Sequence, residues 1–261
     1  MSGDNSSGDN LEEYEDPQLY DIENAPYTDE LPFLLAWASH MKGTIIELAC
    51  GTGRVTIPLA QAGHRLLGVD LHHGMLERAR EKSNAQGVAI DWLEQDCTQL
   101  EVSIHSPMIY MVGNSFQHFL TNEAQDQLLQ GVSRHLQKDG IFIFNTRFPS
   151  REELMQPSTE EYWRSYREEE TSTRVDVYTI SHYNPLEQLQ YYTTIRRYID
   201  QQDQLTRETN TRITLRYVYP KEMERLLFVN GFELVHLYED WKMNPLTADS
   251  YQMIYVCRKK S

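Results

Sequence analysis

The sequence predicts an α/β fold with a seven-stranded, mostly parallel sheet, an antiparallel last strand, and an inserted antiparallel meander of three strands. Three observations lead to this prediction. Short apolar runs alternate with amphipathic stretches that end at glycine, which is the pattern of βαβ units. After residue 150 the pattern changes to a period of two, which indicates antiparallel strands. The length of 261 residues suffices for a core and a sizeable insert.

Five short apolar runs predict the parallel part of the sheet. Each run stands between turn residues and is rich in β-branched or large apolar side chains, which favours a buried strand. The expected strands are residues 44–49, 64–70, 89–96, 107–113 and 141–148. The stretches around them repeat apolar residues at helical spacing, and most of them end at glycine. The expected helices are residues 31–41, 54–63, 73–87 and 121–140.

The rest of the chain predicts the insert and a return to the main sheet. Alternating patterns predict strands at residues 174–183, 189–199 and 209–219, with turns at "NPLEQ" and "DQQDQ". A helix follows at 220–231, with proline at its start and glycine at its end. The runs 232–241 and 251–259 have no helix between them, so the last strand should be antiparallel to its neighbour.

These patterns divide the chain into three parts. Residues 1–13 are almost all polar, small or acidic, a composition that favours disorder. Residues 14–150 and 220–261 form the expected core, whose tyrosine-rich beginning could fold over a site as a lid. Residues 151–219 form the expected antiparallel insert, which would cap the same site.

The composition excludes several classes of function. The net charge of −15 disfavours non-specific binding to nucleic acid, which depends on basic surface. No apolar run approaches the roughly 18 residues that a membrane span needs. The beginning "MSGDNSSGDN" is unlike a signal peptide, so we expect a cytoplasmic protein. Cys50, Cys97 and Cys257 are far apart, and we expect neither a disulfide framework nor a metal site.

The glycine-rich segment "ELACGTGRVT", residues 47–56, follows the first expected strand. A dinucleotide fingerprint needs a third small residue where Thr56 stands, and a P-loop needs a lysine that this segment lacks. A cofactor without phosphates fits better. Gly51 and Gly53 would let the backbone pass close to a ligand, and Glu47 would suit a cationic ammonium group.

Two further acidic residues stand at the ends of expected strands. Asp70 ends the second strand, where a carboxylate can accept hydrogen bonds from both hydroxyls of a ribose. Asp96 ends the third strand and is placed to accept from an adenine amine. Simpler roles remain open at this point: Asp70 as a helix cap, Met75 as core and Asp96 as a turn former.

An ordered set of segments now resembles a known family. The stretch "LACGTGRVTIPLAQAGHRLLGVDLHHGMLERARE" looks like the cofactor-binding half of class I S-adenosylmethionine-dependent methyltransferases, and it is most similar to their bacterial small-molecule branch. The segments "EQDCTQL", "GNSFQHF" and "GIFIFNTRFP" follow in the same order. The resemblance implies a Rossmann-like core, S-adenosyl-L-methionine as the cofactor and S-adenosyl-L-homocysteine as the product.

The resemblance also implies which residues contact the cofactor. For the methionine part they are Glu47, Ala49, Gly51 and Gly53; for the ribose and adenine, Asp70, Leu71, Met75, Asp96 and Cys97; Asn114 would lie beside the sulfonium, and Tyr20 and Tyr27 would contact the cofactor from the lid. Two positions depart from the family's pattern. Ala49 replaces the usual first glycine, and Asn145 stands where relatives often have Asp, which leaves an acid role there in doubt.

The sequence is less specific about the residues that contact the methyl acceptor. Methyl transfer needs a base only when the nucleophile carries a proton that must leave. His118 follows the fourth strand and is the candidate base, with packing or hydrogen bonding as its alternative role. His72 and His73 are expected to cap a helix. The candidate acceptor contacts are Gln117, Arg147, Tyr192, Arg196 and Tyr217.

The sequence therefore predicts a methyltransferase that moves a methyl group directly to nitrogen or oxygen of a small molecule. Two alternatives keep the cofactor: an RNA acceptor, or a protein that binds the cofactor without catalysis. A dehydrogenase is disfavoured by Thr56. The insert could also form a homodimer through an exposed sheet edge.

Overall fold

The computed structural model describes residues 10–168 and 173–260. The strands of the main sheet are β1 (Thr44–Leu48), β2 (Arg65–Asp70), β3 (Asp91–Glu94), β4 (Ser106–Met111), β5 (Leu136–Arg147), β10 (Phe232–Tyr238) and β11 (Gln252–Lys259). The α-helices are α1 (Pro17–Asn24), α2 (Glu30–Ala38), α3 (Thr56–Gln61), α4 (His73–Ala85), α5 (Asn122–His135), α6 (Arg151–Leu154) and α7 (Pro220–Val229).

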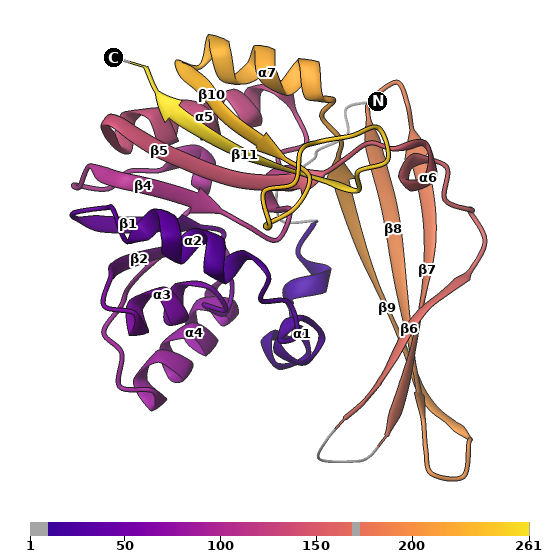
Figure 1. Ribbon diagram of the computed structural model, residues 1–261. Helices are drawn as coiled ribbons and strands as arrows, with labels where there is room; N and C mark the ends of the chain where they lie inside the picture. Colours follow the sequence, from indigo (N-terminus) through magenta and orange to yellow (C-terminus); the bar gives the residue numbers. More distant parts are fainter. Residues whose placement is uncertain (1–9, 169–172, 261) are drawn as a thin grey trace.

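The main sheet has seven strands in the order β10-β11-β5-β4-β1-β2-β3 (Figure 1). Strands β1 to β5 pair in parallel, whereas β11 is antiparallel to both β5 and β10. This confirms the predicted α/β class and the antiparallel last strand. The chain reverses its winding between β1 and β4. Ligands of open α/β sheets bind outside the carboxyl ends of the strands at such a point.

Both faces of the main sheet are buried, as expected for a mostly parallel sheet. Met111 and Phe144 lie on the face that packs against α5 and α7. Tyr110 and Ile143, their neighbours in sequence, lie on the other face with α2 and α3. Because successive strand residues point to opposite faces, these near-continuous apolar strands are covered by helices on both sides.

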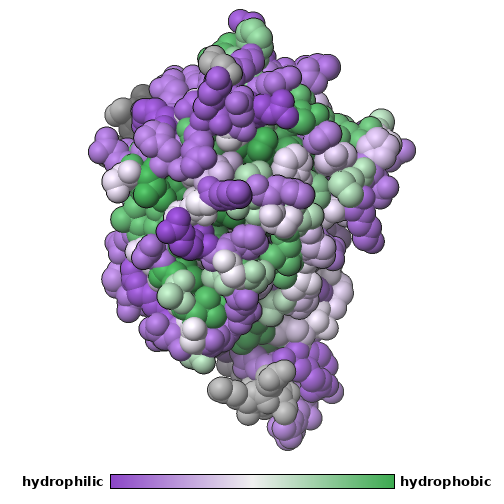
Figure 2. Space-filling model, turned by 60° about the vertical axis from the view of Figure 1, so that its left-hand side comes forward, coloured by the Kyte–Doolittle hydropathy of each residue, from purple (hydrophilic) through white to green (hydrophobic). Residues whose placement is uncertain are grey.

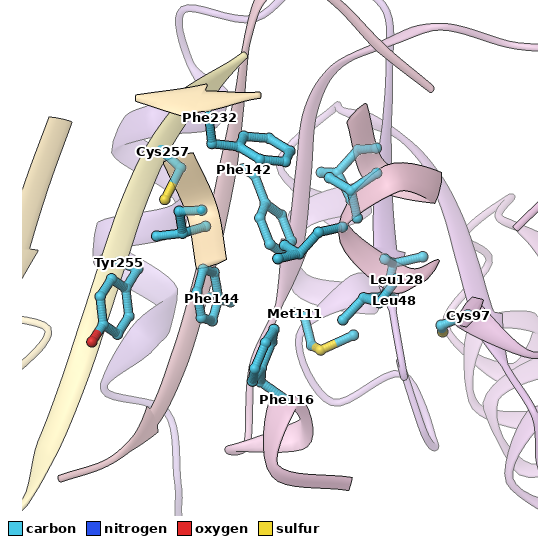
Figure 3. Packing of buried hydrophobic residues seen from close by; sticks show 14 of the residues in the cluster. Leu48, Cys97, Met111, Phe116, Leu128, Phe142, Phe144, Phe232, Tyr255 and Cys257 are labelled. Atoms are coloured by element: carbon cyan, nitrogen blue, oxygen red, sulfur yellow. The ribbon is translucent and has the colours of Figure 1, made fainter. Parts of the chain in front are cut away.

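A stack of aromatic rings fixes the turn after β4 to the core (Figure 3). Phe144 lies with its ring centroid 4.9 Å from those of Phe142 and Tyr255, and 5.0 Å from that of Phe116. Phe116 belongs to the 3-10 helix η4 (Ser115–His118), and its side chain is fully buried. The next two residues of η4 are thereby held at the carboxyl edge of the sheet.

The insert forms a second, antiparallel sheet in the order β6-β7-β8-β9, beside the main sheet in Figure 1. Its strands are β6 (Glu161–Arg167), β7 (Arg174–Asn184), β8 (Leu189–Ile199) and β9 (Leu205–Arg216). The predicted antiparallel insert is confirmed, but its meander has four strands rather than three. The fourth is the edge strand β6. Tyr162 and Trp163 are both exposed there, so the sequence of β6 lacks the alternation that marks a half-buried strand.

The N-terminal segment lies along the insert. Residues 1–13 were expected to be disordered; residues 1–9 lie outside the described residues, and Asn10 to Glu13 lie beside β9. The Asn10 Oδ1 atom accepts from the Thr214 backbone N–H at 2.6 Å, and Asn10 Nδ2 donates to the Thr214 carbonyl at 2.8 Å. Glu12 accepts from the Arg212 backbone N–H at 2.9 Å. Polar side chains here pair with a strand edge, which composition alone does not reveal.

The surface is mixed in character. Hydrophilic and hydrophobic residues are interspersed over the face shown in Figure 2. Basic side chains on the insert pair with carboxylates: Arg197 lies 2.7 Å from Glu160 and 2.8 Å from Glu208. Among the described residues, no helix is long and apolar enough to cross a membrane.

Gln117 joins the two sheets. Its side chain is fully buried, its Oε1 accepts from the Arg147 backbone N–H at 3.4 Å, and its Nε2 donates to the Arg216 carbonyl at 3.4 Å. One amide therefore bonds to the end of β5 and to the end of β9. In this arrangement both polar atoms of Gln117, a predicted acceptor contact, are used by the protein itself.

We predict that Gln117→Leu lowers the free energy of unfolding by about 1–3 kcal/mol, because it leaves a buried N–H and a buried carbonyl unpaired. Urea denaturation measures the change. Gln130→Leu on the exposed side of α5 is the control and should stay within about 0.5 kcal/mol of the parent. Equal stabilities of the two variants would show that the bridge contributes nothing.

Candidate functional site

The loop after β1 is tied to the end of β2 by Asp70. The Asp70 Oδ2 atom accepts from the Gly51 N–H at 2.7 Å, and Oδ1 accepts from the His72 N–H at 2.9 Å. Ala49 and Gly51 have positive φ angles of 51° and 55°, so the chain turns tightly here. A left-handed alanine is strained by about 1–2 kcal/mol, which explains why glycine is the commoner residue at the position of Ala49.

Glu47 lies at the floor of this loop with an exposed fraction of only 2%. The Thr56 hydroxyl and the Tyr110 hydroxyl, the latter at 2.9 Å, both donate to its Oε2 atom. Neither of these two bonds uses the other carboxylate oxygen, Oε1. Burial raises the pKa of Glu47 to about 8, despite the two donors that favour the charged form.

Helix α1 lies over the glycine-rich loop. The Tyr20 ring comes within 3.8 Å of the position that a Cβ on Gly51 would occupy, and the Met75 methyl within 3.3 Å. Gly51 is therefore the residue that keeps the space under α1 open. Tyr27, also predicted in the lid, is about half exposed, and its hydroxyl lies 3.5 Å from Arg164.

Two sets of contacts that the sequence did not predict hold this N-terminal segment, the expected lid, on the core. Arg54 bonds to the Tyr27 carbonyl and pairs with Glu30. Asp21 accepts from the Thr52 hydroxyl at 2.6 Å. It also accepts from Arg78 at 2.9 Å and Lys82 at 2.7 Å of α4. The only indication of these contacts in the sequence is that Thr52 and Arg54 belong to the glycine-rich loop.

The expected adenine side lies between β2 and β3. Met75 is buried, whereas Leu71 is 41% exposed. Asp96 caps the 3-10 helix η3 (Cys97–Gln99) by accepting from the Thr98 N–H at 2.8 Å. Burial raises the pKa of Cys97 to about 12, so its thiol stays uncharged. A cavity of 450 Å³ adjoins Asp96; its other lining residues are Gln95, Gln99, Glu101 and Arg134.

Asn114 and Asn145 form a pair after β4 and in β5. The Asn114 N–H donates to Asn145 Oδ1 at 3.2 Å, and Asn145 Nδ2 donates to Asn114 Oδ1 at 2.8 Å. Asn114 has a positive φ of 61°, which the pair stabilises at this turn. Asn145, which stands where relatives often have Asp, therefore orients Asn114 through both the oxygen and the nitrogen of its side-chain amide.

His118 lies between the lid and the insert. Its Nε2 atom is 2.9 Å from the Tyr14 hydroxyl, and its Nδ1 atom is 3.3 Å from Asn10 Nδ2. Burial and the positive charge of Arg147 lower the pKa of His118 to about 4. The imidazole is therefore neutral near pH 7. Tyr14 and Asn10 were not predicted as its partners, because more than 100 residues separate them from His118 in the sequence.

The carboxylate of Glu153, in the insert, accepts hydrogen bonds from three of the residues that were predicted to contact the methyl acceptor. The Glu153 Oε1 atom accepts from Arg147 at 3.2 Å, Tyr192 at 2.9 Å and Tyr217 at 2.5 Å. Burial raises the pKa of Tyr192 to about 12, so its phenol remains a donor. The sequence predicted Arg147, Tyr192 and Tyr217 but not Glu153, which belongs to the single-turn helix α6.

Arg196, the remaining predicted acceptor contact, is 3% exposed and bonds to the N-terminal segment. Its Nε and one terminal nitrogen donate to the two oxygens of Glu23, both at 2.8 Å, and the same terminal nitrogen donates to Glu13 at 2.8 Å. The Thr211 hydroxyl accepts from the other terminal nitrogen at 2.7 Å. All three nitrogens of this guanidinium therefore bond to the protein. His72 caps α4, as expected, by accepting from the Met75 N–H.

Within the described part of the chain, no group of three or more His, Cys, Asp or Glu side chains is arranged to hold a metal ion.

Comparison with known proteins gives a family match for part of the chain. Residues 45–140 match a family described as a methyltransferase domain. A putative methyltransferase of Geobacillus sp. (strain WCH70) is 31% identical over 101 residues, which is 39% of this chain and 41% of that protein. The chain thus aligns with less than half the length of this relative.

Solved structures match over nearly the whole chain. An S-adenosylmethionine-dependent methyltransferase from Clostridium acetobutylicum has a TM-score of 0.78 at 18% identity, covering 94% of this chain and 97% of its own. The sugar N-methyltransferase KedS8 from Streptoalloteichus has a TM-score of 0.73 at 14% identity, covering 100% and 96%. At these identities the likeness shows the fold alone.

The fold is Rossmann-like with an antiparallel last strand, as in S-adenosylmethionine-dependent methyltransferases of known structure. Residues 45–140 match the methyltransferase-domain family.

We predict that the pKa of Glu47 makes stability fall with rising pH. The pKa of the folded carboxyl is about 8, above the ordinary value of 4.5, so its contribution to stability is complete below pH 4.5 and is lost as pH rises toward 8. Urea unfolding between pH 5 and 8 should show a loss of about 1 kcal/mol per pH unit that is absent from Glu47→Gln. Parallel curves for the two proteins would contradict the raised pKa.

Proposed function

We propose that this protein transfers a methyl group from S-adenosylmethionine to nitrogen or oxygen of a small molecule, by direct in-line displacement. The observation that supports this most is the position of Tyr14. Its hydroxyl bonds to His118, its ring lies 5.9 Å from that of Tyr20 over the glycine-rich loop, and it interacts electrostatically with both Asp70 and Arg147. Tyr14 therefore stands where the proposed cofactor side and acceptor side meet.

The residues at the carboxyl edge fit the cofactor. Asp70 uses one lone pair of each oxygen for a backbone N–H and keeps capacity for ribose hydroxyls. The second oxygen of Glu47 suits an ammonium group, whose positive charge would favour the ionised carboxylate, and the missing Cβ of Gly51 leaves room beneath Tyr20. When bound, the cofactor supplies an activated methyl group on a sulfonium. The protein's own part is to orient the acceptor and to exclude water.

The acceptor is proposed to lie between Tyr14, His118 and the insert. Arg147, Glu153 and the two phenols of Tyr192 and Tyr217 give this side donors and one carboxylate. Such a mixture suits a compact polar molecule better than a polyanion. The sugar N-methyltransferase fold neighbour is consistent with a polar small molecule, whereas the net charge of −15 opposes an RNA acceptor.

Calorimetry and a transfer assay test the proposal. S-adenosylhomocysteine should bind with micromolar affinity, and NADH should not bind. Radiolabelled methyl from S-adenosylmethionine should then enter small molecules of a bacterial extract and leave its RNA unlabelled. Binding of NADH alone would overturn the cofactor assignment, and label in RNA would favour the alternative acceptor.

We predict that Asp70→Ala weakens S-adenosylhomocysteine binding more than tenfold, a loss of about 1.4 kcal/mol or more. The variant loses the ribose contacts and also releases the loop that Gly51 anchors. Titration calorimetry measures the affinity. Asp91→Ala, at the exposed amino end of β3, is the matched control and should bind like the parent. An unchanged affinity in Asp70→Ala would remove Asp70 from the site.

A further inference from the structure

The orientation of the Asn10 amide is fixed by the backbone of β9. Its Oδ1 atom faces the Thr214 N–H at 2.6 Å and its Nδ2 atom faces the Thr214 carbonyl at 2.8 Å. Turning the amide over would set a donor against a donor and an acceptor against an acceptor. The atom that Asn10 presents to His118 Nδ1, at 3.3 Å, is therefore the amide nitrogen, which can only donate.

This donor determines the tautomer of His118. Because Nδ1 accepts from Asn10, the proton of the neutral ring resides on Nε2. Nε2–H then donates to the Tyr14 hydroxyl oxygen at 2.9 Å. Both ring nitrogens are engaged, so the ring has no free lone pair for the proton of an acceptor. Tyr14 keeps one lone pair and its own O–H for the acceptor.

The carboxylates nearest this point are also committed. Asp70 accepts from two backbone N–H groups and has its remaining lone pairs assigned to the proposed ribose contacts, and Glu153 Oε1 accepts from three donors. Glu13 and Glu23 pair with the buried Arg196. No described side chain that faces Tyr14 or His118 thus offers an uncommitted base.

We propose that the docked N-terminal segment holds His118 as a neutral Nε2–H donor to Tyr14, so that the site methylates an amine nitrogen rather than a hydroxyl. A hydroxyl must lose its proton to become a good nucleophile, whereas a neutral amine attacks with its own lone pair. The proposal deepens the proposed function and rests on it. Tyr14 is the acceptor-contacting residue, and Asn10 is a positioning residue that acts through His118.

The transfer balances without a protein base. The acceptor nitrogen uses its lone pair to form the new N–C bond, and the sulfur–carbon bond breaks with its electron pair kept on sulfur. The methylated ammonium then loses its proton to solvent. Tyr14 would accept an N–H of the amine, which leaves the nitrogen lone pair free for the transfer.

The charges around His118 agree with a permanently neutral ring. Arg147 of β5 is the charged group that lowers its pKa, after burial, to about 4. The other groups against the ring are the amide of Asn10 and the phenol of Tyr14, whose pKa burial raises further above its ordinary value. Neither can supply a proton near neutral pH, so the tautomer should not change between pH 6 and 9.

Nitrogen NMR of ¹⁵N-histidine-labelled protein tests the tautomer directly and needs no substrate. The parent protein should show His118 with an unprotonated Nδ1 and a protonated Nε2, unchanged from pH 6 to 9. A protonated Nδ1, or a charged ring near pH 7, would overturn the proposal. A His118→Gln sample assigns the signal by its loss.

Two variants test whether Asn10 sets the tautomer of His118 or only stabilises the fold. Asn10→Asp keeps the size but turns the donor into an acceptor, so His118 should become protonated at Nδ1 and its pKa should rise by about one unit or more. Tyr14→Phe leaves the Asn10 contact intact and should keep the parent tautomer. An unaltered His118 spectrum in Asn10→Asp would show that Asn10 does not set the tautomer and would overturn the proposal.

A product assay tests the preference for nitrogen. S-adenosylmethionine carrying a ¹³C methyl group is incubated with the protein and a bacterial small-molecule extract, and the products are examined by ¹³C NMR, which distinguishes N-methyl from O-methyl carbons. N-methyl products support the proposal, and O-methyl products overturn it. Complete absence of labelled product, with the tautomer as expected, would instead contradict the proposed function.

Discussion

The buried guanidinium of Arg196 determines where the N-terminal segment lies, and the site depends on that segment. Arg196 is 3% exposed and binds Glu23 and Glu13 at 2.8 Å each. Removing either partner from a buried ion pair leaves a charge that is costly to keep in the interior. The segment is therefore strongly favoured in its docked position. Tyr14 follows Glu13 directly, so this pairing also brings the phenol to His118.

A second attachment joins the same segment to the cofactor loop. Asp21 binds Thr52 in that loop and Arg78 and Lys82 on α4. Its side chain is 19% exposed, against 6% for Glu23, so solvent screens these ion pairs more. The Asp21 attachment is thus the more strongly screened of the two.

The sequence predicted what local patterns encode. The period of the apolar residues gave the seven-stranded sheet, and the strand ends located Asp70 and the glycine-rich loop. It is less informative where the partner is distant: nothing in the neighbourhood of Arg196, a predicted acceptor contact, reveals its bond to Glu23, 173 residues away. The two backbone bonds of Gln117 were not predicted for the same reason. The edge strand β6 was missed because its exposed residues need no alternation.

Two functions of the insert are linked by the geometry of one strand. Tyr192 and Arg196 lie on β8, and since side chains alternate along a strand, both point to the same face. Tyr192 contacts Glu153 on the proposed acceptor side, and Arg196 holds the lid segment. A slip of β8 by one residue would move both to the opposite face at once. The register of β8 therefore sets the position of Tyr192 on the proposed acceptor side and the position of Tyr14 together, which gives the large insert a part in a proposed reaction that needs little from the protein beyond orientation.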